Sequence, residues 1–285
     1  MRYAYYPGCS LHVGSKEYDM SWRAVCQVLG IELAEMEDWN CCGTVHASSV
    51  NAQVAHALAA RNLSIAEEMG LDIVAACSGC YKNLRATDIA FKSDRATKER
   101  VNSFLPTPYE GSISVKHPLY LIVNDLGLEA LPNPVRPLHG LRVAPYYGCV
   151  LTRPLYLEPP DHPEQPTGLD RLLTALGAEV IPYPSKTKCC GGAVLLSHTD
   201  VSVELCSRLL KQAKDLGANC LAVACPMCQL ALDGYQPRAE KLLREQLDMP
   251  ILYFTQLMGL AFGIDPKRLG FQRLFVSPST LLARV

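Results

Sequence analysis

Short apolar runs alternate with amphipathic segments along the first half of the chain. An apolar run at residues 2–9 precedes a helix-like segment at 21–30 and a second apolar run at 31–36. An amphipathic stretch at 54–70 and an apolar run at 71–77 follow. Apolar runs of this length predict buried strands, and apolar positions three and four residues apart predict helices. This half is therefore predicted to consist of alternating strands and helices.

The same order returns in the second half. Apolar runs at 141–149, 178–183 and 220–225 are separated by helix-like stretches at 169–177 and 203–217. Such repetition is the signature of a duplicated unit. Alternating strands and helices predict parallel sheets with helices on their faces.

A fourth strand–helix unit completes each half, at 112–127 and 248–263. A proline-rich linker at 131–140 separates the two copies. We therefore predict an α/β fold of two pseudo-symmetric Rossmann-like repeats with parallel sheets, divided into residues 1–135 and 136–285.

Composition excludes several classes of function. With 27 basic and 28 acidic residues in 285, the net charge of −1 argues against a nucleic-acid-binding protein. No apolar run reaches the roughly 18 residues of a membrane span, and the first residues lack the pattern of a secretory signal. We expect a cytoplasmic protein without a membrane span.

Thirteen cysteines are many for such a chain, and ten of them repeat with the units. In each half a single cysteine precedes a Cys-Cys-Gly turn, and 34 residues separate that pair from a C-x-x-C motif. The two sets are Cys9, Cys41, Cys42, Cys77 and Cys80, and Cys149, Cys189, Cys190, Cys225 and Cys228. All of these groups follow predicted strands, whose carboxyl ends share one edge of a sheet, so we expect each set to converge there.

Five thiols in this pattern favour an iron–sulfur cluster. A structural zinc site is closed by four ligands, and the compact ferredoxin motif is absent. The pattern therefore suits a larger or irregular cluster, with a non-redox zinc scaffold as the less favoured alternative. The glycine after each pair lets the backbone approach the cluster and enter a helix, whose N-terminus would face an anionic site. The other cysteines (Cys26, Cys206 and Cys220) are interpreted as small core residues.

These motifs resemble the B subunit of heterodisulfide reductase, a tandem CCG-domain family. The segments "YYPGCSL", "APYYGC", "CSGCY" and "CPMCQ" and both Cys-Cys-Gly turns carry the resemblance, which spans nearly the whole chain. It implies two noncubane 4Fe–4S clusters, one for each set of five cysteines. It also implies a catalytic subunit that reduces or forms a disulfide in two one-electron steps. The alternative is a CCG-domain electron-transfer subunit of a lactate- or glycolate-oxidising system.

The resemblance further implies partners: a ferredoxin-like iron–sulfur protein (the C subunit) and a flavin-containing protein (the A subunit). The substrate would be a small-molecule or a protein-bound, lipoate-type disulfide, and the residues do not choose between them. For proton delivery we predict His117 and Tyr253, which end the fourth strands of the two halves, with His46 and His198 as rivals.

Two further segments carry predictions. The segment 153–170 holds the eight residues that lengthen the second repeat, and either it forms a surface loop or it restricts access to the second cluster. The tail at 265–285 mixes basic and apolar residues, and either it caps the core or it contacts the electron-donating subunit.

Overall fold

The computed structural model describes residues 1–283 and contains two four-stranded parallel sheets. Their strand orders are β2-β1-β3-β4 and β6-β5-β7-β8, so the second sheet repeats the topology of the first. The first sheet consists of β1 (Arg2–Tyr6), β2 (Glu32–Glu35), β3 (Ile73–Ala75) and β4 (Val115–Lys116). The second consists of β5 (Arg142–Tyr146), β6 (Glu179–Val180), β7 (Cys220–Val223) and β8 (Ile251–Tyr253). The predicted α/β fold with two parallel-sheet repeats is confirmed.

Strand register also repeats. Ile73 pairs with Val115 in the first sheet, and Leu221 pairs with Ile251 in the second. Continuing along both edge strands brings His117 and Tyr253 to equivalent positions, as the sequence alignment of the two halves predicted. The central strands that precede the C-x-x-C motifs, β3 and β7, are buried on both faces, which explains why they are wholly apolar in sequence.

Helices connect and cover the strands. In the first half they are η1 (Ser10–Gly14), α1 (Lys16–Leu29), α2 (His46–Val50), α3 (Ala52–Glu68), α4 (Ser78–Ser93), α5 (Arg95–Asn102), α6 (Pro118–Tyr120), η2 (Leu121–Gly127) and η3 (Leu128–Ala130). In the second half they are α7 (Cys149–Thr152), η4 (Leu155–Leu157), α8 (Gly168–Ala175), η5 (Gly192–Val194), α9 (Thr199–Asp215), α10 (Pro226–Gln229), η6 (Leu230–Gly234), α11 (Gln236–Leu243), α12 (Phe254–Ala261), η7 (Pro266–Leu269), η8 (Phe271–Arg273) and α13 (Ser279–Leu282). Within the described chain, none of them combines the length and apolar character needed to cross a membrane.

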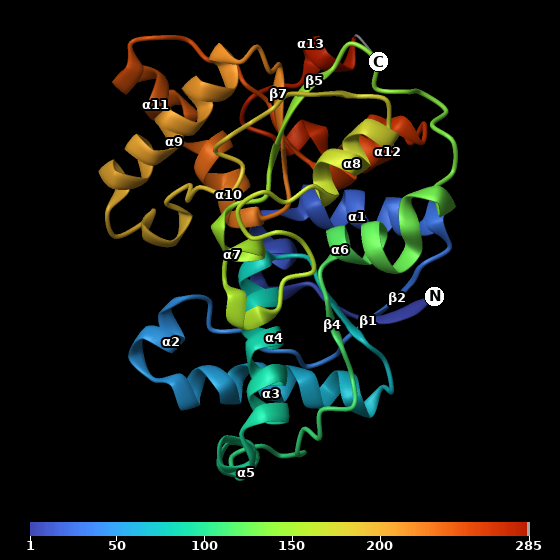
Figure 1. Ribbon diagram of the computed structural model, residues 1–285, viewed down its shortest axis with the longest axis vertical. Coiled ribbons are helices and arrows are strands. Elements are labelled where there is room, and N and C mark those ends of the chain that lie inside the picture. The colour runs from blue at the N-terminus through green and yellow to red at the C-terminus, as the bar shows by residue number, and fades with distance from the viewer. Residues whose placement is uncertain (284–285) are drawn as a thin grey trace.

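Each repeat packs the helix that follows its fourth strand against the other repeat. Helix α12, after the last strand of the second sheet, packs on α1 of the first half, and α6 with η2 packs on α8 of the second half. Figure 1 shows α1, α6, α8 and α12 gathered between the lower, blue-to-green part and the upper, orange-to-red part of the molecule. Ser21 of α1 and Thr255 of α12 share a hydrogen bond of 2.7 Å at this boundary. Each repeat thus completes the core of the other.

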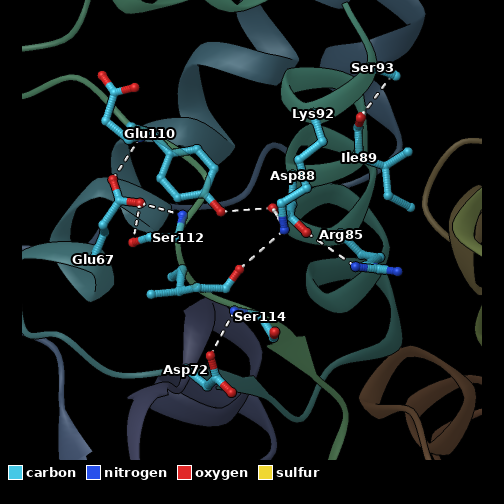
Figure 2. Close-up of polar contacts among 12 residues, drawn as sticks. Glu67, Asp72, Arg85, Asp88, Ile89, Lys92, Ser93, Glu110, Ser112 and Ser114 are labelled. Atoms are coloured by element: carbon cyan, nitrogen blue, oxygen red, sulfur yellow. Dashed lines mark hydrogen bonds and ion pairs between the residues drawn. The ribbon is translucent and has the colours of Figure 1, made fainter.

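Hydrogen bonds to Glu67 of α3 and to Asp72, just before β3, hold the segment that leads into β4 (Figure 2). The Glu67 carboxylate accepts the backbone N–H groups of Glu110 and Ser112, each at 2.7 Å. The Asp72 carboxylate accepts the N–H of Ser114, also at 2.7 Å. Because β4 is only two residues long, these contacts add to its pairing with β3 in holding His117, the next residue, in place.

The inserted segment and the tail both lie against the first half. Glu158 of the inserted segment forms an ion pair with Arg85 of α4 at 3.3 Å. In the tail, Leu269 and Phe271 are buried, and Arg273 lies 3.5 Å from Glu17 of α1. The tail therefore packs on the core through these residues, contact with an electron-donating subunit stays a prediction, and residues 284 and 285 lie outside the described residues.

Candidate functional site

The cysteine loops of both halves line one cleft of about 170 Å³. Nine of the ten repeated cysteines line it: Cys9, Cys42, Cys77, Cys80, Cys149, Cys189, Cys190, Cys225 and Cys228. The thiol of the tenth, Cys41, lies 4.0 Å from that of Cys9. A larger groove of about 480 Å³ beside α3 contains no thiol and offers no comparable chemistry. The expected convergence therefore goes further than predicted, since both sets meet in a single cleft.

Thiols pair in the same way in the two halves. The sulfurs of Cys42 and Cys80 are 3.3 Å apart, and those of Cys190 and Cys228 are 3.4 Å apart. None of the cysteines forms a disulfide. The second cysteine of each adjacent pair thus faces the second cysteine of its own C-x-x-C motif.

The two sets are neighbours at Cys77 and Cys225, which both line the cleft. Contact with Cys225 is the main cause that holds the pKa of the buried Cys77 thiol well above its usual range. Each of these residues lies two positions after the end of its strand, β3 or β7, and directly precedes a helix, α4 or α10. The two metal sites expected from the sequence would therefore be neighbours across the boundary between the repeats.

The donor set fits a cationic group. Contact with Cys42, contact with Cys77 and burial, in that order, hold the pKa of Cys80 well above its usual range. Contacts with Cys190 and Cys225, together with burial, hold the pKa of Cys228 well above its usual range in the same way. So many buried thiols cannot all ionise beside one another, whereas metal ions supply the positive charge that lets them bind as thiolates.

The spacing favours a polynuclear group over a single ion. Within residues 1–283, no three His, Cys, Asp or Glu side chains are arranged as ligands of one metal ion. The thiols instead form connected groups, in which Cys80 lies against both Cys42 and Cys77, and Cys228 lies against both Cys190 and Cys225. That distribution suits several irons, each bound by one or two thiolates, better than the closed tetrahedral zinc site weighed as an alternative.

Two buried tyrosines hold the Cys-Cys-Gly loops. The hydroxyl of Tyr6 donates to the carbonyl oxygen of Asn40 at 2.8 Å, and that of Tyr146 donates to the carbonyl oxygen of Lys188 at 2.6 Å. Asn40 and Lys188 are the residues just before the two cysteine pairs. Sequence reasoning did not single out these supports, although a tyrosine three residues before the first cysteine of each half was a visible signal.

Glycines let thiols lie against the backbone. Gly8 and Gly148 have φ of +61° and +71°. A Cβ on Gly8 would lie 3.2 Å from the sulfur of Cys80, and one on Gly148 would lie 2.9 Å from the sulfur of Cys228. These equivalent glycines precede the first cysteine of each set, so the close approach predicted for glycine also occurs outside the Cys-Cys-Gly turn.

Each Cys-Cys-Gly turn leads first into a short helical segment, α2 from His46 or η5 from Gly192. The long helices α3 and α9 begin only at residues 52 and 199. In the second turn, loop N–H groups face the thiols instead: that of Gly191 donates to the sulfur of Cys189 at 3.3 Å, and that of Gly192 donates to Cys190 at 3.4 Å. Other helices start at the cysteines: α4 and α10 directly after Cys77 and Cys225, η1 directly after Cys9, and α7 at Cys149.

The proposed proton donors occupy different places. His46 lines the cleft, and its Nδ1 lies 2.8 Å from the hydroxyl of Thr44. His117, Tyr253 and His198 are not among the cleft-lining residues. His117 is fully buried, and burial lowers its pKa to about 4, so it is neutral at pH 7. Proton donation by His117 or Tyr253 therefore stays a prediction, with no contact to the cleft behind it.

The remaining cysteines and the inserted segment also stand outside the cleft. Cys26, Cys206 and Cys220 are buried, as expected for core residues. Cys206 does more than fill space, because its thiol lies 3.2 Å from the carbonyl oxygens of Cys190 and Ala231. No residue of the segment 153–170 lines the cleft, so the restricted access proposed for it stays a prediction.

Comparison with known proteins places this site in a family. The CCG cysteine-rich domain matches twice, at residues 3–85 and 143–233. The chain is 34% identical over 283 residues to the 8-methylmenaquinol:fumarate reductase membrane anchor subunit of Wolinella succinogenes, with 98% of each chain covered. It is 30% identical over 284 residues to the B subunit of a ferredoxin/F420H2-dependent CoB-CoM heterodisulfide reductase of Methanosarcina acetivorans, covering 98% of this chain and 95% of that one.

A protein of Archaeoglobus profundus that is described as similar to the heterodisulfide reductase B subunit is also 30% identical, over 94% of this chain and 93% of its own length. Among solved structures, a hypothetical protein from Helicobacter pylori has the same fold, with a TM-score of 0.81 at 15% identity over 97% of this chain. This chain spans about half, 52%, of that solved chain. With two matching domains and relatives aligned over nearly its whole length, the chain belongs to the tandem CCG cysteine-rich domain family that includes the heterodisulfide reductase B subunit.

Proposed function

We propose that this protein is the disulfide-converting subunit of a heterodisulfide reductase-like complex and holds two noncubane 4Fe–4S clusters. Its relatives make it an iron–sulfur subunit of an oxidoreductase complex. The observation that supports the finer proposal is the meeting of both cysteine sets in one cleft. One disulfide bound there would be within reach of both sets at once.

Each set of five cysteines would hold one cluster, as the sequence repeat indicates. When bound, the pair would supply two electrons, one from each cluster. Reducing a disulfide to two thiols also consumes two protons. His46, which lines the cleft beside Thr44, is the side chain best placed to deliver them.

Electrons would come from other proteins of the complex. We propose a ferredoxin-like C subunit as the direct donor and a flavin-containing A subunit upstream of it. Support comes from the names of the relatives, which describe them as subunits of larger reductases.

The metal content tests this proposal first. Anaerobically reconstituted protein is expected to hold about eight irons and eight sulfides per chain. Cys42→Ser and Cys190→Ser are each expected to lose about half of the iron, because each removes a buried thiol of one set. Cys220→Ser is the matched control, since this buried cysteine lies in β7 outside the cleft. Four irons in the wild-type chain would contradict two clusters.

A second candidate function is electron transfer with a quinol, as in the reductase named for the relative from Wolinella succinogenes. A specific observation favours it: within the described chain no Lys, Arg, Asp or Glu side chain lines the cleft. A cleft without these charged side chains suits an apolar redox partner as well as a neutral disulfide. An electron-transfer subunit of a lactate- or glycolate-oxidising system would need neither a quinol nor a disulfide in the cleft.

One experiment separates these functions. The reduced protein, loaded with iron and sulfide, is mixed anaerobically with a neutral disulfide, with a water-soluble menaquinone analogue, or with buffer. Reoxidation is followed by absorbance. Fast reoxidation by the disulfide, with release of two thiols per molecule, supports the primary proposal. Reoxidation by the quinone alone supports the second candidate. Reoxidation by neither compound supports the electron-transfer subunit of a lactate- or glycolate-oxidising system.

A further inference from the structure

One buried histidine links the two repeats where their cysteine sets meet. The Nε2 of His117 lies 3.1 Å from the carbonyl oxygen of Ala76 and 3.2 Å from that of Ala224. Ala76 directly precedes Cys77, and Ala224 directly precedes Cys225. A single side chain therefore touches the ends of both central strands, just where each chain turns into its C-x-x-C motif.

The hydrogen-bond network assigns the ring proton. The N–H of Leu119 donates to Nδ1 of His117 at 3.2 Å, so Nδ1 is an acceptor. The proton of the neutral ring is then on Nε2, which donates to the two carbonyl oxygens. Burial lowers the pKa of His117 to about 4, so this arrangement persists at neutral pH.

The link breaks the symmetry of the two repeats. Tyr253 occupies the equivalent position in the second sheet, but its hydroxyl makes no hydrogen bond with the described residues. Its ring stacks instead on Tyr18, with centroids 4.1 Å apart. Ser78 adds a weaker contact from the first half, with its hydroxyl 3.3 Å from the carbonyl oxygen of Ala224.

The surroundings hold His117 firmly. The rings of Tyr81 and Tyr120 pack against it, with centroids 5.7 and 6.2 Å from that of the imidazole. The backbone leading to it is pinned by Glu67 and Asp72 (Figure 2). A side chain held this rigidly can fix a distance between the two elements that it joins.

We propose that His117 is a positioning residue that fixes the separation of Cys77 and Cys225, and thereby the coupling between the two metal centres. The first part concerns the polypeptide alone. The second part rests on the proposed function, because it requires a cluster on each side.

The first test uses the metal-free chain. Mild oxidation with diamide, followed by peptide mass spectrometry, measures the rate at which a Cys77–Cys225 disulfide forms. His117→Phe keeps a buried ring but removes the donor, and we expect a rate about fivefold lower, the factor that corresponds to one neutral hydrogen bond of about 1 kcal/mol. His117→Gln, which restores an N–H donor, is expected to recover most of the rate. His56→Phe is the control, because the hydrogen bond of His56 to Thr87 lies within the first repeat.

The second test uses the iron-loaded chain. With equal iron content, His117→Phe is expected to weaken the magnetic interaction between the reduced centres in electron paramagnetic resonance spectra, and His117→Gln is expected to restore it. If His117→Phe does not fold, Ser78→Ala removes the weaker donor to Ala224 and should cause a smaller change in the same direction.

The outcomes separate the two ideas. A wild-type chain that binds only one cluster would defeat the proposed function, while a lower crosslinking rate in His117→Phe would still support the link. Equal crosslinking rates in the wild type and His117→Phe, or the absence of this crosslink in the wild type, would overturn the positioning role.

Discussion

Single glycines determine how closely the backbone can approach the thiols. Gly148 has φ of +71° and ψ of 177°, a conformation that residues with a Cβ rarely adopt. The sulfur of Cys228 occupies the space that a side chain there would need. Conformation and contact therefore both require glycine at this position.

Comparing Gly148→Ala with a control should separate the cost of the backbone conformation from the cost of the contact with Cys228. Gly140→Ala is the matched control, because Gly140 also has a positive φ, +83°, but a Cβ on it would have no atom within 4 Å. The control should lose about 1–2 kcal/mol of unfolding free energy from backbone strain alone. Gly148→Ala should lose more and also about half of the bound iron, as measured by urea unfolding and iron analysis. Full iron content in Gly148→Ala would contradict the role of the contact.

At the scale of elements, one buried carboxylate helps to hold the tail. Asp233, in η6, accepts the N–H groups of Phe275 and Val276 at 2.9 Å each and the side-chain amide of Gln229 at 2.7 Å. Burial nevertheless raises the pKa of Asp233 to about 6, because the hydrogen bonds only partly offset the loss of hydration. The anchor of the tail is therefore sensitive to pH.

The sign of this effect follows from the raised pKa. The folded state favours protonated Asp233, so its contribution to stability is complete below the ordinary pKa of 3.8 and is lost as the pH rises through about 6. A shift of about two pKa units corresponds to about 3 kcal/mol. Between pH 4 and pH 7, the unfolding free energy of the metal-free wild type should fall by about this amount relative to Asp233→Asn. Parallel pH profiles in urea titrations would rule this out.

Capping and docking by the tail can be tested with two of its residues. Leu269 is fully buried, so Leu269→Ala should lower the unfolding free energy by about 2–5 kcal/mol. Phe275 is 69% exposed, so Phe275→Ser should change stability by less than about 0.5 kcal/mol. If the tail also contacts the electron-donating subunit, Phe275→Ser should weaken complex formation in a pull-down without loss of iron. Unchanged binding would leave the tail with capping alone.

At the scale of the whole molecule, the repeats depend on each other because α12 packs on α1 of the first half and α6 packs on α8 of the second. Tyr18 of α1 packs against Phe254 of α12 with ring centroids 6.2 Å apart, and the neighbouring Ser21 bonds Thr255. Both tyrosine and phenylalanine are fully buried in the intact chain. A half cut from the chain would expose this surface to water, at a cost of several kcal/mol.

The fragment 1–135 should therefore not fold alone, although its boundary follows the sequence repeat. Its amide NMR spectrum should show poor dispersion, and its circular dichroism should lack a cooperative thermal transition. Adding the fragment 136–285 should restore both, because each half supplies the helix that the other needs. A cooperative transition in the isolated fragment would show that the repeats are independent domains.

The order of the elements and the two matching sets of cysteines could be predicted from the sequence alone. Both are recorded in local patterns: the alternation of apolar and amphipathic runs, and the 34-residue interval that recurs between Cys42 and Cys77 and between Cys190 and Cys225. Duplication made these patterns easy to detect, because each half confirmed the interpretation of the other. The equivalence of His117 and Tyr253 was predictable for the same reason.

How the two halves face each other could not be predicted from the sequence and is seen only in the tertiary structure. The contact of Cys77 with Cys225, the packing of α6 and α12 against the opposite repeat, and the link from His117 to Ala224, 107 residues away, all depend on that arrangement. Periodicity shows which face of an element is buried but does not identify the element that covers it. That choice is made by the packing of complementary surfaces, which brings both cysteine sets into one cleft.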